Sequence, residues 1–401
     1  MNIKRLTWLI ALLTVTVCTV SAEEAKTQEK KEKTTIEVPA WVKNIKVSGY
    51  GMLQYQAEDS KKPDAKHNEF NLRLARLIFD GKIGDFDWRV QLQGTSNAGP
   101  GNPTVMLVDL YTEWAKYKEF RVRAGQFKRA FTFENPTHPI TQGWYSYGMV
   151  VNNLSGFGDR TGEKSSGGRD IGLQVQGDLF PNSDGRRLLH YQFGIYNGEG
   201  INQKDMDQRK DIIGGLWVMP IAGVRIGVFG WTGSRGKMIY DYETIHTGKY
   251  LLDAEDNKIE QIEKKGLTCS MSKNRYAISA EYDKDEWTFR AEYIHSQGWG
   301  AAKAGNNVRE IDYSKGDKAD GFYCFGIVPV IKSKLHAKAR YNLYRPQKKW
   351  NTSKTMYEVG LNYYINKNIQ INAEYARVNE RVPNVSSYNY NFADIELDFR
   401  F

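Results

Sequence analysis

The sequence predicts an all-β protein, a transmembrane antiparallel β-barrel of about sixteen strands with an inward-folded constriction loop. Three observations carry this prediction. From Lys43 almost to the C-terminus, apolar residues recur at every second position, which is the period of a strand. Short turns alternate with long loops between these segments. Trp and Tyr residues gather near the segment ends, as the two aromatic girdles of a membrane barrel require.

The N-terminus has the features of an exported protein. Lys4 and Arg5 precede an apolar run that ends at Val17, and small residues follow at Ser21 and Ala22. This is the pattern of a secretory signal peptide, and the run is shorter than the roughly 20 residues of a spanning helix. The charged stretch that follows is expected to be a solvated leader, with a short coiled-coil or partner-binding segment as the alternative. The predicted segments are 1–22 (signal peptide), 23–42 (charged N-terminal leader) and 43–401 (barrel domain).

Composition narrows the class further. Of 401 residues, 40% are hydrophobic and 13% aromatic, too many for a disordered chain. The mean hydropathy of −0.59 excludes a helical membrane bundle, but a barrel keeps a polar average because half of its strand residues face the lumen. The formal net charge of +9 does not indicate nucleic-acid binding in an exported chain. Beyond the signal peptide there are two cysteines, Cys269 and Cys324, and the sequence does not show whether they pair.

Each strand segment has an apolar face and a polar face. In FDWRVQLQGT, residues 86–95, Phe, Trp, Val and Leu alternate with Asp, Arg and Gln. The segments DIGLQVQGDL and LHAKARYNLY repeat this pattern. The predicted strand cores are residues 45–56, 69–80, 86–96, 105–115, 120–130, 169–179, 188–197, 210–219, 224–232, 275–283, 287–296, 320–328, 335–344, 354–364, 369–379 and 389–401.

The connections support the same topology. Short turns such as GKIGD, KYKE, DKDE and INKN alternate with long connections. A soluble β-sandwich is the alternative, but its strands are typically about five to six residues long and its connections need not alternate. The long connections are expected at residues 57–68, 131–168, 198–209, 233–274, 297–319 and 380–388.

The connection at 131–168 is the predicted constriction. It is too long for a hairpin and carries its own apolar and aromatic residues, so we expect it to fold into the lumen, with a surface loop as the alternative. The connection at 233–274 is more charged and is expected to stay outside.

Strand parity places charged side chains in the lumen, because a charge on the lipid face costs about 2–4 kcal/mol at the midplane. Arginine forks can hold phosphate oxygens bidentately, which favours anion binding. A mixed lumen, however, is equally consistent with structural ion pairs. The basic candidates by parity are Arg89, Arg121, Arg123, Arg290, Lys338 and Arg340. The acidic residues on the same faces are Asp87, Asp109, Glu113, Glu281, Glu292, Glu358, Glu374 and Glu396.

Three stretches resemble the phosphate-selective porin O and P family: NLRLARLIFDGKIGDFDWRVQLQ, RVRAGQFKRAFTFEN and GGRDIGLQVQG. The resemblance is strongest over residues 45–180 and at the C-terminus. It implies a trimeric, sixteen-stranded outer-membrane porin that conducts anions past basic pore-lining residues. In the family's strand-two pair, Arg73 matches the first Arg, but the second position is Leu74, with Arg76 nearby.

The resemblance also covers the approach to the constriction loop. Phosphate-selective members carry a Lys directly after the Glu that matches Glu134, whereas this chain has Asn135; Lys128 and Arg129 lie close by. This departure weakens the expectation of phosphate specificity. The C-terminal ADIELDFRF is similar to that of outer-membrane barrels generally, so Phe401 is expected to be read by the barrel-assembly machinery. Candidate constriction-loop residues are Glu134, Asn135, His138 and Arg160.

The sequence therefore predicts a porin of the cell outer membrane for passive diffusion of small hydrophilic solutes, namely anions such as phosphate or polyphosphate. The expected partners are a small anionic solute, outer-membrane lipid, the assembly machinery and two further copies in a homotrimer. The alternatives are a general porin with weak charge preference, or a barrel that is a rim enzyme, adhesin or assembly component. Six scattered His without ligand spacing, and no Gly-rich phosphate loop or metal motif, argue against an enzyme, a cofactor or a metal.

Overall fold

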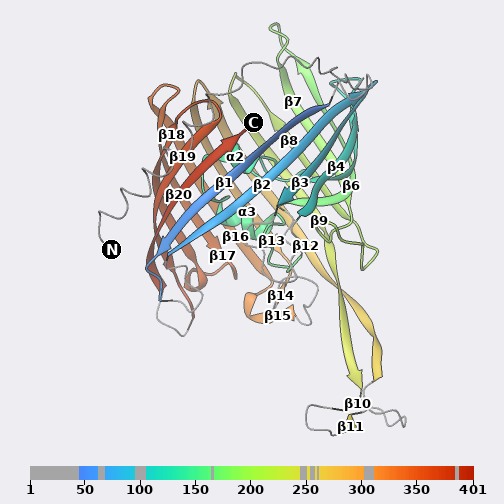
Figure 1. Cartoon of the computed structure of the whole chain (residues 1–401). Coiled ribbons are helices and arrows are strands. Elements are labelled where there is room, and N and C mark those ends of the chain that lie inside the picture. Colours follow the sequence, from blue (N-terminus) through green and yellow to red (C-terminus); the bar gives the residue numbers. More distant parts are fainter. Residues whose placement is uncertain are drawn as a thin grey trace, which may run out of the picture. The chain divides into compact units, whose positions relative to one another are not determined.

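The computed structural model describes residues 45–61, 68–94, 105–163, 167–243, 251–252, 258–259, 262–301, 311–383 and 388–401. The expected signal peptide and leader lie outside these residues. Sixteen of the described strands form one closed antiparallel barrel, in which each strand pairs with its neighbours along the chain (Figure 1). Every predicted strand core coincides with a barrel strand, so the predicted fold class is confirmed.

The barrel strands are β1 (Lys46–Glu58), β2 (Asn68–Ile83), β3 (Phe86–Gly94), β4 (Val105–Trp114), β5 (Arg121–Lys128), β6 (Arg169–Pro181), β7 (Arg187–Tyr196), β8 (Asp211–Val218), β9 (Val224–Glu243), β12 (Ile262–Lys284), β13 (Trp287–Gln297), β16 (Lys318–Ile331), β17 (Leu335–Arg345), β18 (Lys354–Tyr364), β19 (Ile369–Glu380) and β20 (Tyr388–Arg400). The short elements are α2 (Pro139–Gln142), α3 (Met149–Leu154), β10 (Leu251–Leu252), β11 (Lys258–Ile259), β14 (Gly300–Ala301), β15 (Ile311–Asp312), η2 (Tyr313–Lys315) and η3 (Trp350–Thr352). None of the described helices is long and apolar enough to span a membrane.

One predicted loop is shorter than expected. The sequence assigns residues 233–274 to a loop, but β9 continues to Glu243 and β12 begins at Ile262, and the two pair through most of this region. The hairpin projects past the other strands (Figure 1). The apolar–polar contrast that marks a membrane-facing strand is weak in this segment, because backbone pairing beyond the membrane does not need an apolar face.

The C-terminal segment closes the barrel. In β20, Asp394, Glu396 and Asp398 are at most 1% exposed on the lumenal side, while the apolar residues between them face outward. The backbone of Phe401 exchanges two hydrogen bonds of 3.0 Å with Gly49 of β1. The Phe401 ring covers Gly49, where a Cβ atom would approach it to 2.6 Å. Glycine is therefore required on β1 so that the aromatic ring can lie flat across the seam.

A β-bulge in β2 explains how two arginines of different parity both face the lumen. Met52 of β1 pairs with Leu74, and Leu53 pairs with Leu72, so Arg73 is an extra residue in the ladder. Such a bulge shifts the alternation by one residue. Arg73 at the bulge and Arg76 beyond it therefore both point inward. Arg73 contacts Glu396, and Arg76 contacts Tyr50.

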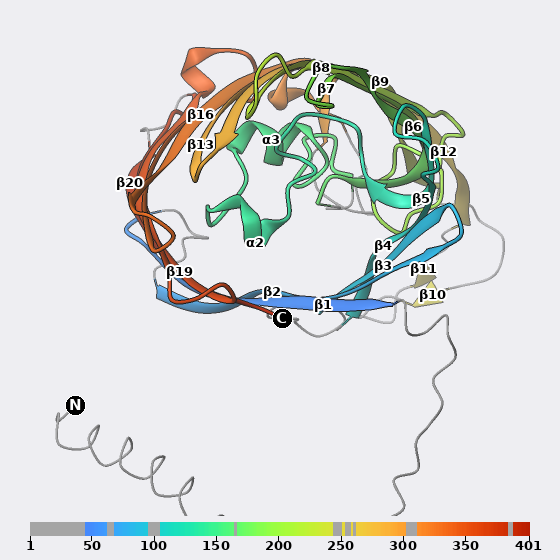
Figure 2. The ribbon, with the colours of Figure 1, turned by 90° about the horizontal axis from the view of Figure 1, so that it is seen from above.

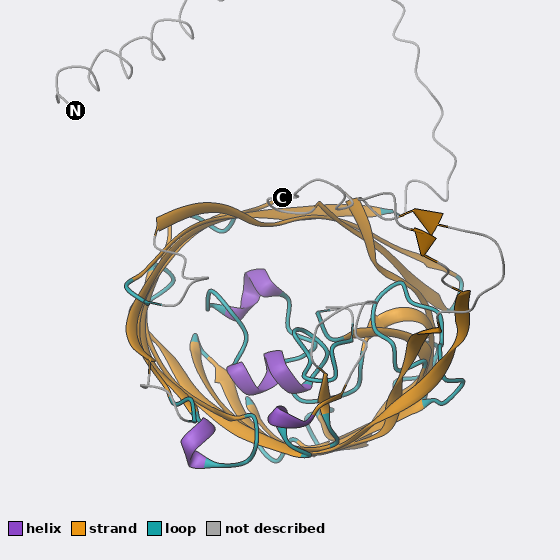
Figure 3. Cartoon of the chain, turned by 90° about the horizontal axis from the view of Figure 1, so that it is seen from below, coloured by secondary structure: helices purple, strands orange, loops and turns teal. Residues whose placement is uncertain are grey.

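The long connection between β5 and β6 folds into the barrel, as predicted. Viewed along the barrel, α2 and α3 lie inside the ring of strands (Figures 2 and 3). Phe131, Val150 and Leu154 are completely buried there and belong to one apolar cluster with wall residues such as Phe229 and Tyr323. The loop fills part of the lumen because it carries its own hydrophobic residues.

Candidate functional site

Carboxylates of the barrel wall hold the constriction loop by accepting hydrogen bonds from its backbone. Glu292 of β13 accepts from the N–H groups of Phe133 at 2.6 Å and Glu134 at 3.1 Å. Glu374 of β19 accepts from the N–H of Tyr145 at 2.9 Å. These lumenal acids, which parity reasoning could not assign to a role, therefore satisfy loop backbone donors that would otherwise be buried without partners.

Basic side chains of the same wall bind the loop carbonyls. Lys338 donates to the carbonyl of Gly143, and Arg340 to that of Ser146, each at 2.7 Å. Both are at most 1% exposed at the side chain and are neutralised, Lys338 by Glu374 at 2.5 Å and Arg340 by Glu358 at 2.7 Å. The structure thus places these two predicted pore residues between the wall and the loop.

A water-accessible cavity of about 260 Å³ lies on the other side of the loop, against strands β3 to β9. Six basic side chains and one carboxylate, that of Asp109, are among the described residues that line it. The basic residues are Arg89, Arg123, Lys128, Arg129, Arg169 and Arg225. Two histidines, His138 and His190, also line it. This cavity is the candidate functional site.

Four of the predicted basic candidates, Arg89, Arg123, Lys128 and Arg129, reach this cavity. The prediction missed Arg169 and Arg225. Arg225 alternates with the outward Ile226 and Val228 of β9, so strand parity could have found it. Arg169 is the first residue of β6, so no alternation of apolar and polar residues precedes it. The sequence pattern therefore does not indicate which way its side chain faces.

Three of the cavity arginines pair with acids that are not among the lining residues. Arg89 pairs with Asp80 at 2.7 Å, and Arg225 pairs with Glu281 at 2.6 Å. Arg123 pairs with Glu113. None of these three acids lines the cavity; Glu113 and Glu281 are buried at the side chain, whereas Asp80 is partly exposed.

Arg129 is the most strongly neutralised of the set. It contacts Glu163 at 2.7 Å and Asp170 at 3.0 Å, and all three side chains have no exposed surface. Two carboxylates around one guanidinium hold the constriction loop to β6, and we assign Arg129 a structural role on that geometry.

Its neighbour Lys128 has a different environment. The ammonium donates to the carbonyl oxygens of Asn135 at 2.5 Å and Thr137 at 2.8 Å and to the Tyr147 hydroxyl at 3.2 Å. No carboxylate of the described residues lies within ion-pair distance of it. The side-chain nitrogen of Lys128 therefore contacts only neutral oxygens.

Arg76 does not line the cavity, and no carboxylate of the described residues lies within ion-pair distance of it. It is 8% exposed, and it donates to the Tyr50 hydroxyl and the Gln93 side-chain oxygen, both at 2.9 Å. Arg169, by contrast, binds Asp109 bidentately at 2.7 and 3.0 Å. Arg76, Lys128, Arg169 and Asp109 thus place three basic side chains near one carboxylate. We call these four residues the basic cluster.

The histidine of the loop is held neutral beside this cluster. Burial, followed by the positive charges of Lys128 and Arg89, lowers the pKa of His138 to about 3. Its Nε2 atom lies 3.3 Å from a guanidinium nitrogen of Arg89, which suits a neutral acceptor.

The remaining predicted site residues lie away from the cavity or serve the loop. Arg121 pairs with Asp178, Arg290 with Glu281 and Arg73 with Glu396, at 2.9, 2.5 and 2.8 Å. Glu134 accepts from the side chain of Gln142 and the N–H of Gly148. Asn135 is fully buried and donates to the carbonyl of Arg129. Arg160 donates to the carbonyls of Lys315 and Gly316 at 2.7 Å.

A sixteen-stranded barrel with an inward loop and a charged aqueous cavity defines the class of outer-membrane porins. Residues 47–195 match the family described as phosphate-selective porin O and P, so the resemblance to this family is confirmed over those residues. This stretch includes the constriction loop and every residue of the basic cluster. The described residues therefore form a sixteen-stranded barrel, and residues 47–195 of the chain match a porin family.

Solved structures show the same fold. An anion-selective porin from Comamonas acidovorans matches with a TM-score of 0.58 at 10% identity, over 89% of this chain and 99% of that chain. OmpF of Salmonella typhi, in complex with daunomycin, matches with a TM-score of 0.55 at 11% identity, over 89% and 98%. The outer membrane channel DcaP of Acinetobacter baumannii matches with a TM-score of 0.53 at 11% identity, over 89% and 97%. No curated protein sequence matches the chain.

Proposed function

We propose that the protein conducts small anions by passive diffusion, with phosphate-type oxyanions as the preferred solutes. The observation that carries this proposal is the basic cluster, which has three basic side chains and one carboxylate, and of which Lys128, Arg169 and Asp109 line the cavity. A site that binds an ion weakly lets the ion enter and leave, whereas a fully neutralised wall offers no such attraction. The anion-selective porin among the structural relatives has the same fold and is consistent with this function.

The solute step follows from these side chains. The Lys128 ammonium is a point charge held by neutral oxygens, so an incoming oxyanion can replace one of those acceptors. The Arg169 fork is oriented by Asp109, and its Nη1 atom also donates to the carbonyl of Gly167 at 3.3 Å, so Arg169 places a fixed positive charge beside Lys128. The buried Asn135 takes no part, so Lys128 supplies the ammonium that the family motif places seven residues later.

The proposal is tested by reversal potentials in planar bilayers under a salt gradient. A unit charge about 8 Å from an ion changes its energy by about 0.5 kcal/mol at the dielectric of water, so we expect Lys128→Gln to lower the anion-to-cation permeability ratio about twofold. The matched control is Lys82→Gln, because Lys82 is 61% exposed in a turn-end pair with Asp87. Cation preference in the unmodified protein would overturn the proposal.

Selectivity for phosphate is measured separately, as the block of chloride current by added phosphate. Block that weakens in Lys128→Gln supports the oxyanion form. Anion preference without block leaves a general porin with weak charge preference, and absence of any conductance favours a rim enzyme, adhesin or assembly component.

We further propose the assembled state and its biogenesis. The chain is expected to lose residues 1–22 on export, to be folded by the assembly machinery through Phe401, and to form a homotrimer; one structural relative, OmpT of Vibrio cholerae, is described in a trimer form. A mature N-terminus at Glu23 and a trimer mass in detergent are the expected results.

A further inference from the structure

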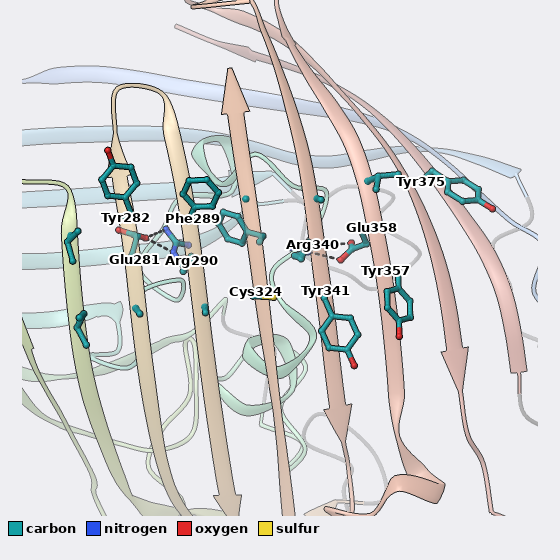
Figure 4. A pocket seen from close by; sticks show the side chains of 18 of the residues that line it. Glu281, Tyr282, Phe289, Arg290, Cys324, Arg340, Tyr341, Tyr357, Glu358 and Tyr375 are labelled. Carbon is teal, nitrogen blue, oxygen red and sulfur yellow. Dashed lines mark hydrogen bonds and ion pairs between the residues drawn. The ribbon is translucent and has the colours of Figure 1, made fainter. Parts of the chain in front are cut away.

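The outer face of the barrel has a groove that is separate from the lumenal cavity. It has a volume of about 1010 Å³ and runs across the outward side chains of β9, β12, β13 and β16 to β19 (Figure 4). Its floor consists of small residues that the strand register brings side by side. Ala280 pairs with Ala291, and Ala291 pairs with Cys324. Gly326 pairs with Ala339 on the next row.

Large aromatic side chains form the rim of this floor. Tyr341 and Tyr357 are cross-strand partners with ring centroids 5.1 Å apart, and both project outward (Figure 4). Phe289 stands at the opposite side, against Gly326. A groove of small apolar groups between aromatic side chains has a surface that suits a hydrocarbon chain.

The groove continues toward the rim that carries the long loops. A polar cleft of about 370 Å³ shares Tyr341 and Tyr357 with the groove and adds Trp350 and Arg381. In outer-membrane barrels the long loops are extracellular, so this cleft lies at the headgroup level of the outer leaflet.

Two arginines stand at this junction on the outward face. Arg377 pairs across the ladder with Tyr357 and donates to the side-chain oxygen of Asn391 at 3.1 Å. Arg381 donates to the carbonyl of Trp350 at 3.4 Å. Neither has a carboxylate within ion-pair distance among the described residues; Asp59 is the nearby acid, bound to Asn391 at 2.6 Å.

These two outward arginines differ from the lumenal arginines of the strands β12 to β17. Every arginine on the inner walls of β12 to β17 has a carboxylate partner within 3 Å, including Arg275, Arg290, Arg340 and Arg345. A charge on the lipid side of a barrel is unfavourable unless it reaches the interface and meets a counter-charge there. The negative groups available at that level are lipid phosphates.

We propose that a phosphorylated lipid of the outer leaflet binds here, with an acyl chain in the groove and a phosphate on Arg377 and Arg381. The order along the surface, apolar floor, aromatic rim and then two cations, follows the order of groups in such a lipid. This site lies on the opposite side of the wall from the anion path and does not depend on the proposed transport function.

The test is native mass spectrometry of the full chain released from detergent in the presence of lipid A. Diphosphoryl lipid A is compared with the same lipid after enzymatic dephosphorylation. We expect the phosphorylated form to remain bound at a concentration about tenfold lower, because Arg–phosphate contacts are charge-assisted. Equal retention of the two lipids would overturn the proposal without any substitution in the protein.

The variant Arg377→Gln/Arg381→Gln identifies the site. Both residues are exposed, so the barrel should fold, and a heat-dependent shift in gel mobility checks this. The variant is expected to lose the preference for phosphate, whereas Lys332→Gln/Lys334→Gln, at an exposed turn on the opposite rim, keeps it. An unchanged preference for phosphate in the arginine variant would refute the assignment. Loss of the trimer with lipid retention intact would also refute it, because it would indicate that the two arginines contact another copy of the protein.

Discussion

Replacing Asp159 with Asn should loosen the constriction loop from the barrel wall. Asp159 lies near the end of the loop and binds Arg275 of β12 with two contacts, at 2.6 and 2.8 Å. Neither side chain has any exposed surface. Removing one partner of a buried, bidentate pair leaves the other charge without compensation, which costs about 3–5 kcal/mol. Arg275 would recover part of this free energy only if the loop moved and admitted water.

Two measurements report how far the substitution undocks the loop. A penalty of that size raises the population of undocked loop by roughly two to three orders of magnitude, since about 1.4 kcal/mol is tenfold. Single-channel recordings of Asp159→Asn should therefore show transitions to a larger conductance, because the loop fills part of the lumen. The heat-induced change in gel mobility should occur at a lower temperature.

The control is the exposed ion pair of Lys82 and Asp87, whose atoms are 3.7 Å apart and whose side chains are 61% and 52% exposed. Asp87→Asn is expected to change stability by no more than about 1 kcal/mol and to leave conductance steady. The double variant Asp159→Leu/Arg275→Met should recover part of the lost stability, because it removes both charges but leaves the N–H groups of Gly156 and Thr161 without their acceptor. Identical conductance histograms for Asp159→Asn and Asp87→Asn would refute the reasoning.

Two further predictions concern the loop and the seam. The pKa of His138 is lowered from 6.5 to about 3, so the docked loop loses up to about 1.4 kcal/mol of stability per pH unit as the pH falls below 6.5. The conductance should therefore begin to vary with pH between 6.5 and 5. The variant His138→Gln should show a flatter pH profile in this range. Gly51→Ala would place a Cβ atom 2.4 Å from the Phe399 ring and should lower the temperature of the gel-mobility change. Adding Phe399→Leu in the same chain should restore part of the lost stability. A Gly51→Ala variant as stable as the unmodified protein would contradict this packing.

The barrel fold could be predicted from the sequence because the pattern that indicates it runs along each strand separately. Lipid on one side and water on the other impose an alternation of period two along each strand, and this needs no knowledge of which strands meet. ADIELDFRF is the clearest case, with its carboxylates buried toward the lumen and its apolar residues outward. The inward loop was also predictable, because 38 residues between strands with their own aromatic groups need a place to bury them.

The extent of β9 and β12 was not predictable in this way. Beyond the membrane, strand pairing is set by backbone hydrogen bonds, and these leave no apolar stripe in the sequence.

The charge balance of the lumen was decided by tertiary structure alone. Lys128 and Arg129 are adjacent in the sequence, yet Arg129 lies between two carboxylates and Lys128 contacts only neutral oxygens. Arg73 and Arg76 differ in parity, yet a single bulge turns both inward. Periodicity fixes which side of the wall a charge faces. Whether that charge remains available to a solute depends on partners tens to hundreds of residues away, which only the closed barrel and its folded loop bring into contact.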